Sequence, residues 1–225
     1  MTCRIAKLNL TDRISMPINI KMALLKRVAA FLALLILPVQ SLFTWKIEYA
    51  EQFYRLYHQH IYHYPEESAE NLWYLSMALR SPFANPLNAL AEIENELEWE
   101  KYRNLFLMHV HLRIVSEYLN LAAKHDKFDA YFYNYPWKSA NLDSLKTAEA
   151  YYKLALESWE AARLHGKAAR DPKFRWIYLD EVQFWEDEAF RIENEELDYG
   201  DIIAVHLARL ARIRSEFASM DYETY

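Results

Sequence analysis

The sequence has 225 residues, of which 53% are hydrophobic and 16% aromatic, so the chain can bury a sizeable core and is not disordered as a whole. It contains only two glycines, Gly166 and Gly200, whereas a Rossmann fingerprint or a P-loop requires several glycines within one turn. Tight turns between strands also favour glycine, which argues against an all-β sandwich or barrel. These properties predict an all-α protein.

The formal net charge of −6 is unevenly distributed along the chain. Residues 1–41 hold six basic residues and one acidic residue, a balance of +5, whereas the rest of the chain holds 20 basic and 31 acidic residues, a balance of −11. An acidic body repels phosphate backbones, and no basic stripe interleaved with aromatic residues occurs in the sequence. We therefore expect no nucleic-acid partner.

The segment 22–41 has the layout of a secretory signal peptide. Two adjacent cations precede the unbroken apolar run 28–37, and Val39 and Ser41 suit the −3 and −1 positions of a cleavage site. Residues 1–21 fit no part of this pattern and are interpreted as an additional upstream segment. We therefore expect export to the periplasm.

Two alternatives to a cleaved signal remain open for this segment. The apolar run is shorter than the about 20 residues of a comfortable membrane span, but Leu42, Phe43 and Trp45 could extend it into a retained anchor. Contact with the inner membrane is expected only in that case. A buried first helix is disfavoured, because Lys26 and Arg27 lie at its start.

Beyond residue 42 the apolar residues recur at helical spacing, and residues 42–225 are expected to form a single domain of about seven helices. Asn85-Pro86 and Asp171-Pro172 are typical helix starts, in which a capping side chain precedes a proline in the first turn. Gly166 is expected to end the fifth helix. The predicted helices span residues 47–64, 66–80, 86–97, 98–124, 142–164 and 172–197, with a last one after Gly200.

Two architectures are compatible with these helices. Ala148, Tyr152 and Ala155 have the spacing of the second helix of a tetratricopeptide repeat (TPR), in which small residues let neighbouring helices approach. No 34-residue period is visible, however, and alanines at any crowded helix crossing would give the same pattern. The prediction is therefore either a TPR-like solenoid of helix pairs or an irregular helical bundle.

The densest group of potential metal ligands is formed by His58, His60 and His63. On a helix His60 and His63 lie three residues apart and could share an ion, whereas His58 points elsewhere. The acidic residue that could join them, Glu67, lies beyond Pro65. We therefore expect structural or surface histidines here, with a metal or small-ligand site as the alternative.

Common catalytic motifs are absent from the sequence. It contains no HExxH motif, no repeated Glu-x-x-His motif and no G-x-S-x-G motif. Its only cysteine, Cys3, precedes the predicted signal, so the body has no cysteine nucleophile and no cysteine pair. The sequence predicts no catalytic residues, no metal site and no cofactor.

The most unusual segment is the aromatic loop, residues 129–138, which has the sequence DAYFYNYPWK. Its rings either fill a gap between the protein's own helices or form a surface that binds a partner or ligand. Tyr and Trp combine a large contact area with few rotatable bonds and are therefore enriched in interface hot spots. The candidate partner-binding residues are Tyr131, Tyr133, Tyr135 and Trp137.

Three segments of the chain resemble a known family, the TPR-like periplasmic proteins of spirochaetes that are associated with the flagellar motor collar. The segments are FANPLNALAEI (83–93), EWEKYRNLFLMHVHLRIV (98–115) and KFDAYFYNYPWKSANLDSLKTAEAYYKLALESW (127–159). The resemblance covers roughly residues 70–165. It implies a non-catalytic scaffold around the periplasmic flagellar motor, with motor components as partners. The family lends no catalytic residues to this chain.

Overall fold

The computed structural model describes residues 46–128 and 135–223, and within these ranges it contains six α-helices, several short 3₁₀ turns and no strand. The prediction of an all-α fold is confirmed. The described helices all belong to one compact unit, Ile47–Tyr225. The predicted signal segment 22–41 and the upstream residues 1–21 lie outside the described residues.

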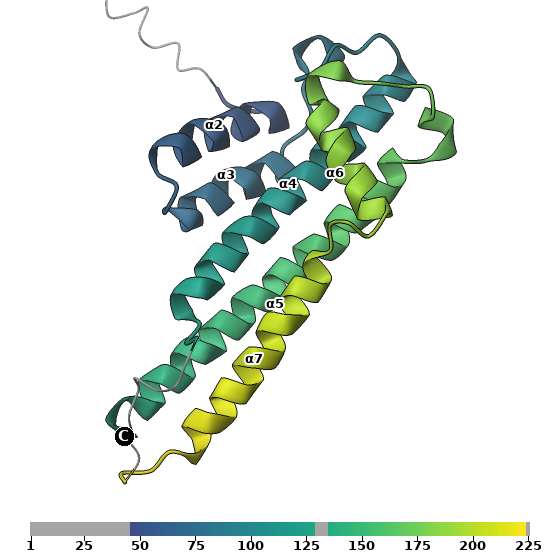
Figure 1. Ribbon diagram of the computed structural model, residues 1–225. Coiled ribbons are helices and arrows are strands. Elements are labelled where there is room, and N and C mark those ends of the chain that lie inside the picture. Colours follow the sequence, from purple (N-terminus) through teal and green to yellow (C-terminus); the bar gives the residue numbers. More distant parts are fainter. Residues whose placement is uncertain (1–45, 129–134, 224–225) are drawn as a thin grey trace, which may run out of the picture. The chain divides into compact units, whose positions relative to one another are not determined.

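The two longest helices, α4 (Glu96–His125) and α5 (Lys138–Ala169), pair more extensively than any other two elements. Helix α7 (Tyr199–Ser219) packs along α5, and α6 (Gln183–Glu193) packs on both α4 and α5 (Figure 1).

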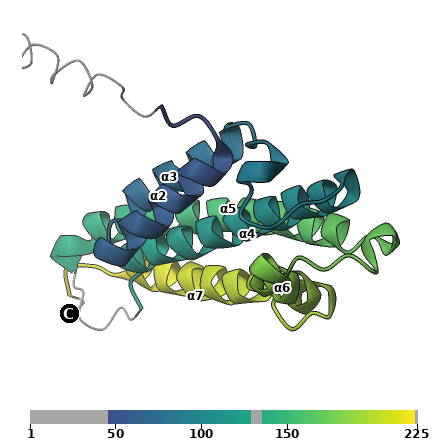
Figure 2. The ribbon, with the colours of Figure 1, turned by 90° about the horizontal axis from the view of Figure 1, so that it is seen from above.

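A second hairpin precedes the long helices. Helices α2 (Ala50–His63) and α3 (Ser68–Arg80) pack on each other, and α3 contacts α4. Figure 2 shows this hairpin on one side of the α4–α5 pair and α7 on the other side.

Of the two predicted architectures, the irregular bundle fits. Helix α4 has 30 residues and α5 has 32, whereas a TPR unit accommodates two helices within about 34 residues. Ala148 and Ala155 are fully buried on α5, where their small side chains allow the neighbouring helices to approach closely. The spacing that suggested a TPR therefore reflects a crowded helix crossing.

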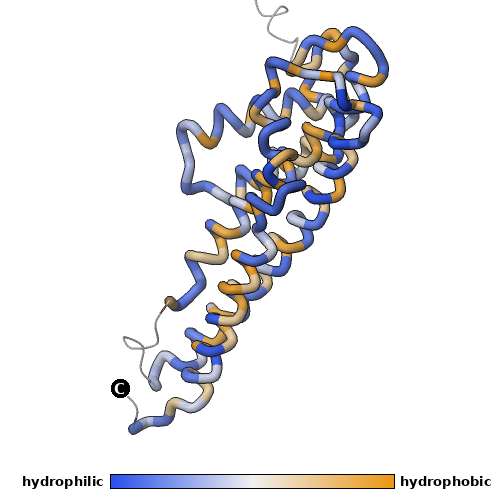
Figure 3. Tube along the Cα trace, turned by 45° about the vertical axis from the view of Figure 1, so that its right-hand side comes forward, coloured by the Kyte–Doolittle hydropathy of each residue, from blue (hydrophilic) through white to orange (hydrophobic). Residues whose placement is uncertain are grey.

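The core is rich in aromatic rings. Trp99 and Tyr102 of α4 stack with their ring centroids 5.3 Å apart, and Phe106 meets Trp185 of α6 edge to face at 5.8 Å. Hydrophobic positions recur between hydrophilic ones along the long helices (Figure 3). Because α4 lies between α3, α5 and α6, it buries residues around most of its circumference.

The predicted helix over residues 86–97 is wrong. The structure has only a 3₁₀ turn, Pro86–Asn88, and the Asn85 side chain makes no capping hydrogen bond. Helix α4 begins at Glu96 instead, because the side chain of Asn95 accepts a hydrogen bond of 3.0 Å from the backbone N–H of Glu98.

The predicted helix over residues 172–197 is also wrong in its first half. Asp171 does cap, but two 3₁₀ turns, Pro172–Phe174 and Asp180–Val182, follow in place of a helix, and α6 begins at Gln183. Because a 3₁₀ turn replaces the helix predicted over residues 86–97, the described residues contain six helices rather than about seven.

Gly166 does not end α5, which continues to Ala169. A Cβ atom at residue 166 would lie 3.3 Å from Sδ of Met108 on α4. The glycine therefore permits a close approach of α4 and α5 rather than terminating the helix.

Among the described residues, no helix combines the length and apolarity that a membrane span requires.

Candidate functional site

The structure describes two of the four predicted partner-binding residues. Tyr135 and Trp137 form the 3₁₀ turn that precedes α5, and their side chains are 42% and 63% exposed. Tyr131 and Tyr133 lie outside the described residues. Both described rings are accessible to a partner, and their role in binding stays a prediction.

The flanks of the aromatic loop are fastened to the helices. Lys138 Nζ donates to the backbone carbonyl of Met220, 3.0 Å away, so the start of α5 is tied to the end of α7. The Arg209 side chain on α7 is paired with Asp126, and its guanidinium lies 4.7 Å from the ring centroid of Phe128. These contacts attach the residues on both sides of the aromatic loop to the ends of α5 and α7.

Four exposed aromatic rings lie on and before α6, and sequence analysis missed them. We refer to them together as the α6 aromatic surface: Trp176 (78% exposed), Tyr178 (70%), Phe184 (58%) and Phe190 (47%). The sequence predicted a single helix over residues 172–197, but α6 begins only at Gln183, so Trp176 and Tyr178 precede the helix.

Each ring of the α6 aromatic surface has a cation near it. Cation-to-centroid distances lie between 5.1 Å, for Arg175 over Trp176, and 5.9 Å, for Lys101 over Tyr178. Arg113 lies over Phe184 and Arg170 over Phe190 at intermediate distances. Such pairs are attractive at exposed sites and help to hold the rings in place.

A buried ion-pair network holds α6 on α4. His109 Nδ1 and Glu188 Oε2 are 2.5 Å apart, and Arg113 donates to Oε1 of the same carboxylate at 2.7 Å. The imidazole of His109 stacks on Trp185 with centroids 5.1 Å apart. Burial lowers the pKa of His109, and the Glu188 carboxylate opposes that effect. Because the imidazole and carboxylate are both buried, the pair is suited to fixing α6 rather than to reacting with a substrate.

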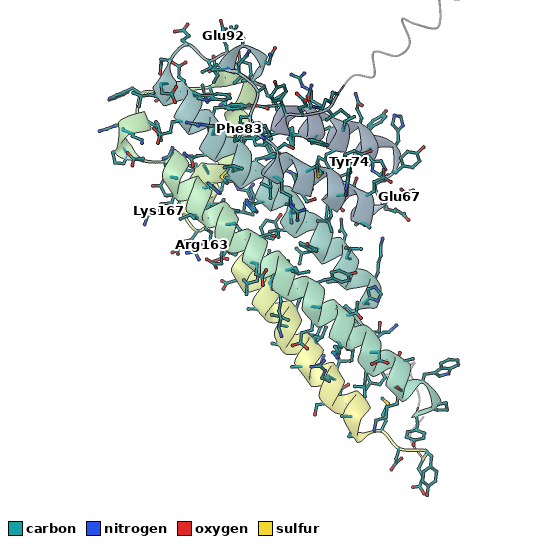
Figure 4. The ribbon with its side chains drawn as sticks, turned by 180° about the vertical axis from the view of Figure 1, so that it is seen from behind. Glu67, Tyr74, Phe83, Glu92, Arg163 and Lys167 are labelled. Carbon is teal, nitrogen blue, oxygen red and sulfur yellow. The ribbon has the colours of Figure 1, made fainter. Side chains whose placement is uncertain are left out.

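A groove of about 630 Å³ lies between α5 and the α6–α7 connection. Arg163 and Lys167 of α5 line one side of it (Figure 4), and Glu193, Glu195 and Asp198 contribute acidic groups.

The three histidines of the predicted cluster do not form one group. His58 packs edge to face against Tyr54, with centroids 4.5 Å apart, and His63 is exposed beside Tyr62. His60 alone faces α3, where its Nε2 lies 3.7 Å from Glu67 Oε2 and 3.4 Å from Glu70 Oε2. Sequence analysis noted Glu67 but missed Glu70.

The orientation of the His60 ring is fixed by hydrogen bonds to two buried residues, Asn71 and, through it, Glu117. His60 Nδ1 lies 2.8 Å from Asn71 Oδ1, and the Asn71 amide donates to Glu117 Oε1 at 3.2 Å. Asn71 and Glu117 are both buried. Because a carboxylate oxygen accepts, the NH₂ group of Asn71 faces Glu117 and its oxygen faces His60. His60 therefore carries its hydrogen on Nδ1, and in the neutral ring the lone pair of Nε2 points toward Glu67 and Glu70.

A family model described as a domain of unknown function, DUF8513, matches residues 97–220, more than half of the chain. The chain belongs to this family. No curated protein matches the sequence, and no solved structure matches it. The DUF8513 region runs from the first turn of α4 to just beyond α7, so it contains the α6 aromatic surface and the aromatic loop. The α2–α3 hairpin, with its His60 group, precedes this region.

Proposed function

We propose that this protein is a non-catalytic scaffold that binds other proteins and is exported to the periplasm. The observation that carries the proposal is the α6 aromatic surface, where four large rings are exposed within residues 176–190. Exposed hydrophobic side chains that cluster on a soluble protein commonly mark an interaction site. Trp and Tyr are also the residues on which interface affinity most often depends.

The position of α6 and of its exposed rings is fixed before any partner binds. The buried contacts of Glu188 with His109 and Arg113 fix α6 on α4, and the neighbouring cations restrain the rings. A surface held in this way loses little conformational entropy when a partner binds. The exposed rings Tyr135 and Trp137 provide a second contact region within the same family domain.

The narrower form of the proposal concerns the partners. The resemblance to collar-associated periplasmic proteins suggests components of the flagellar motor, and that resemblance is its only support. The signal-like segment 22–41 supports the periplasmic location. The acidic body argues against a nucleic-acid partner.

Quantitative co-purification from native cells tests the proposal. We expect the Trp176→Ala/Tyr178→Ala variant to lose partners that the wild-type protein retains, because truncating hot-spot rings costs about 2 kcal/mol or more of binding energy. Tyr62→Ala is the matched control, since Tyr62 is 82% exposed on α2 outside the family region. Equal recovery with both variants would contradict the use of this surface. Recovery without motor components would contradict the narrower form alone.

A further inference from the structure

The connection between α2 and α3 brings three potential metal ligands together. His60 lies in the last turn of α2, Glu67 precedes α3, and Glu70 lies in its first turn. One ligand atom from each of the three lies within 4.8 Å of the other two. Figure 4 shows Glu67 and Tyr74 on this hairpin, away from Arg163 and Lys167 of α5.

The distances within this group fit a shared ion. His60 Nε2 lies 3.4 and 3.7 Å from the nearest oxygens of Glu70 and Glu67, which is longer than an ordinary hydrogen bond of about 2.7–3.2 Å. Around a tetrahedral zinc ion with bonds of about 2.0–2.2 Å, neighbouring ligand atoms lie ~3.3–3.6 Å apart. The two distances from His60 Nε2 are therefore close to those between ligands of one ion, and the oxygens of Glu67 and Glu70 lie within 4.8 Å of each other.

The imidazole is oriented as a metal-binding histidine requires. Its Nδ1–H donates to Asn71, which the buried Glu117 holds in turn, so Nε2 is left as the ligand atom. Histidines that bind metals commonly use their second nitrogen in this way, and the hydrogen bond fixes the ring and raises its basicity.

The carboxylates are placed to complete the site. The Tyr74 hydroxyl donates to Glu70 Oε1 at 3.3 Å, which leaves Oε2 directed at His60. The side chain of His60 is only 11% exposed, whereas those of Glu67 and Glu70 are 56% and 50% exposed, so an ion can enter from the solvent.

We propose that His60, Glu67 and Glu70 bind one divalent transition-metal ion of the zinc type. Imidazole with carboxylate suits zinc and its neighbours, whereas Mg²⁺ and Ca²⁺ prefer oxygen ligands alone. The ion clamps the end of α2 to the start of α3. Three protein ligands leave a coordination position for water or for a side chain of a bound partner. This site precedes the DUF8513 region and does not depend on the proposed scaffold function.

Calorimetric titration of the tag-free, metal-stripped protein with Zn²⁺ tests the proposal. We expect one equivalent of Zn²⁺ to bind to the wild-type protein, with a rise in melting temperature, and Mg²⁺ at the same concentration to produce neither effect. The variants His60→Gln and Glu67→Gln/Glu70→Gln should bind Zn²⁺ at least about tenfold more weakly.

Two neighbouring variants serve as matched controls. His63→Gln removes an exposed histidine from the same end of α2, and Glu66→Gln removes an exposed carboxylate from the same turn, so both should bind Zn²⁺ as the wild type does. Unchanged binding in Glu67→Gln/Glu70→Gln, equal loss in His63→Gln, or no binding to the wild type would overturn the proposal. Glu67 and Glu70 are exposed, so this double variant decides the outcome even if His60→Gln disturbs folding.

Discussion

At the residue scale, exposure separates the aromatic rings that stabilise the fold from those available for binding. Trp159 of α5 is buried against α7 at 2% exposure, whereas Trp137 in the aromatic loop is 63% exposed. Sequence analysis left the role of Trp137 open, because a ring of the aromatic loop could either fill a gap between the protein's own helices or face a partner.

The two tryptophans should therefore respond differently to truncation. We expect Trp159→Ala to lower the free energy of unfolding by about 3–5 kcal/mol, as other truncations of buried aromatic residues do. Trp137→Ala should change it by less than about 0.5 kcal/mol, which is typical of surface positions. Urea denaturation of both purified variants measures this difference. A large loss in Trp137→Ala would show that the ring packs against the protein's own helices.

A second prediction at this scale concerns acid stability. Burial, with a smaller contribution from the neighbouring His165, lowers the pKa of His111 to about 4. In the unfolded chain, His111 has an ordinary histidine pKa of about 6.5. Between about pH 6.5 and 4, His111 therefore binds a proton in the unfolded chain but not in the folded chain. The contribution of His111 to stability is complete above this window and is lost as the pH falls through it.

Thermal melts across this pH range check the sign. The melting temperature of His111→Gln should fall less steeply between pH 7 and 4 than that of the wild type. A steeper fall in the variant would mean that the folded protein favours the charged imidazole, contrary to the burial of this ring.

At the element scale, the start of α4 is set by the residue whose side chain caps the helix, Asn95. Both Asn85 and Asn95 are suitable caps by residue type, but only Asn95 makes the capping hydrogen bond. The Glu98 side chain also accepts from the backbone N–H of Glu94 at 2.6 Å, which reinforces the start of α4. The proline after Asn85 was a misleading signal because it opens only a 3₁₀ turn.

The two asparagines thus provide a matched pair. Asn95→Ala should lower the free energy of unfolding by about 1 kcal/mol, the usual cost of losing an N-cap. Asn85→Ala should leave it nearly unchanged, because this exposed side chain caps nothing in the structure. Denaturant titration of both variants provides the comparison, and equal losses would place a cap at both positions.

Turns limited the prediction of the candidate sites more than helices did. Helical periodicity and proline placement identified most helices, but they do not specify how the chain reverses after His63. The reversal at Pro65 is what carries Glu67 and Glu70 to His60. The α6 aromatic surface was missed for a related reason, since residues 175–182 interrupt the helix that apolar spacing suggested.

At the scale of the whole molecule, the paucity of glycine and the apolar spacing were sufficient to predict an all-α fold. They could not decide between a solenoid and a bundle, because helix length rather than residue type distinguishes the two. The 30 residues of α4 and 32 of α5 make that distinction.

Export of the protein stays a prediction. If the segment 22–41 is a cleaved signal, the mature protein begins at Leu42 and is recovered from the periplasm. N-terminal sequencing of the native protein after cell fractionation determines both points. A soluble cytoplasmic chain that starts at Met1 or Met22 would refute export.

The most direct test of the scaffold proposal is site-specific photo-crosslinking in native cells. A photoreactive residue in place of Tyr178 should form discrete adducts with a partner protein, because this ring lies on the α6 aromatic surface and is 70% exposed. The same residue in place of Tyr62 on α2 should form none of these adducts. Adducts from both positions in equal yield, or from neither, would contradict a partner bound at this surface.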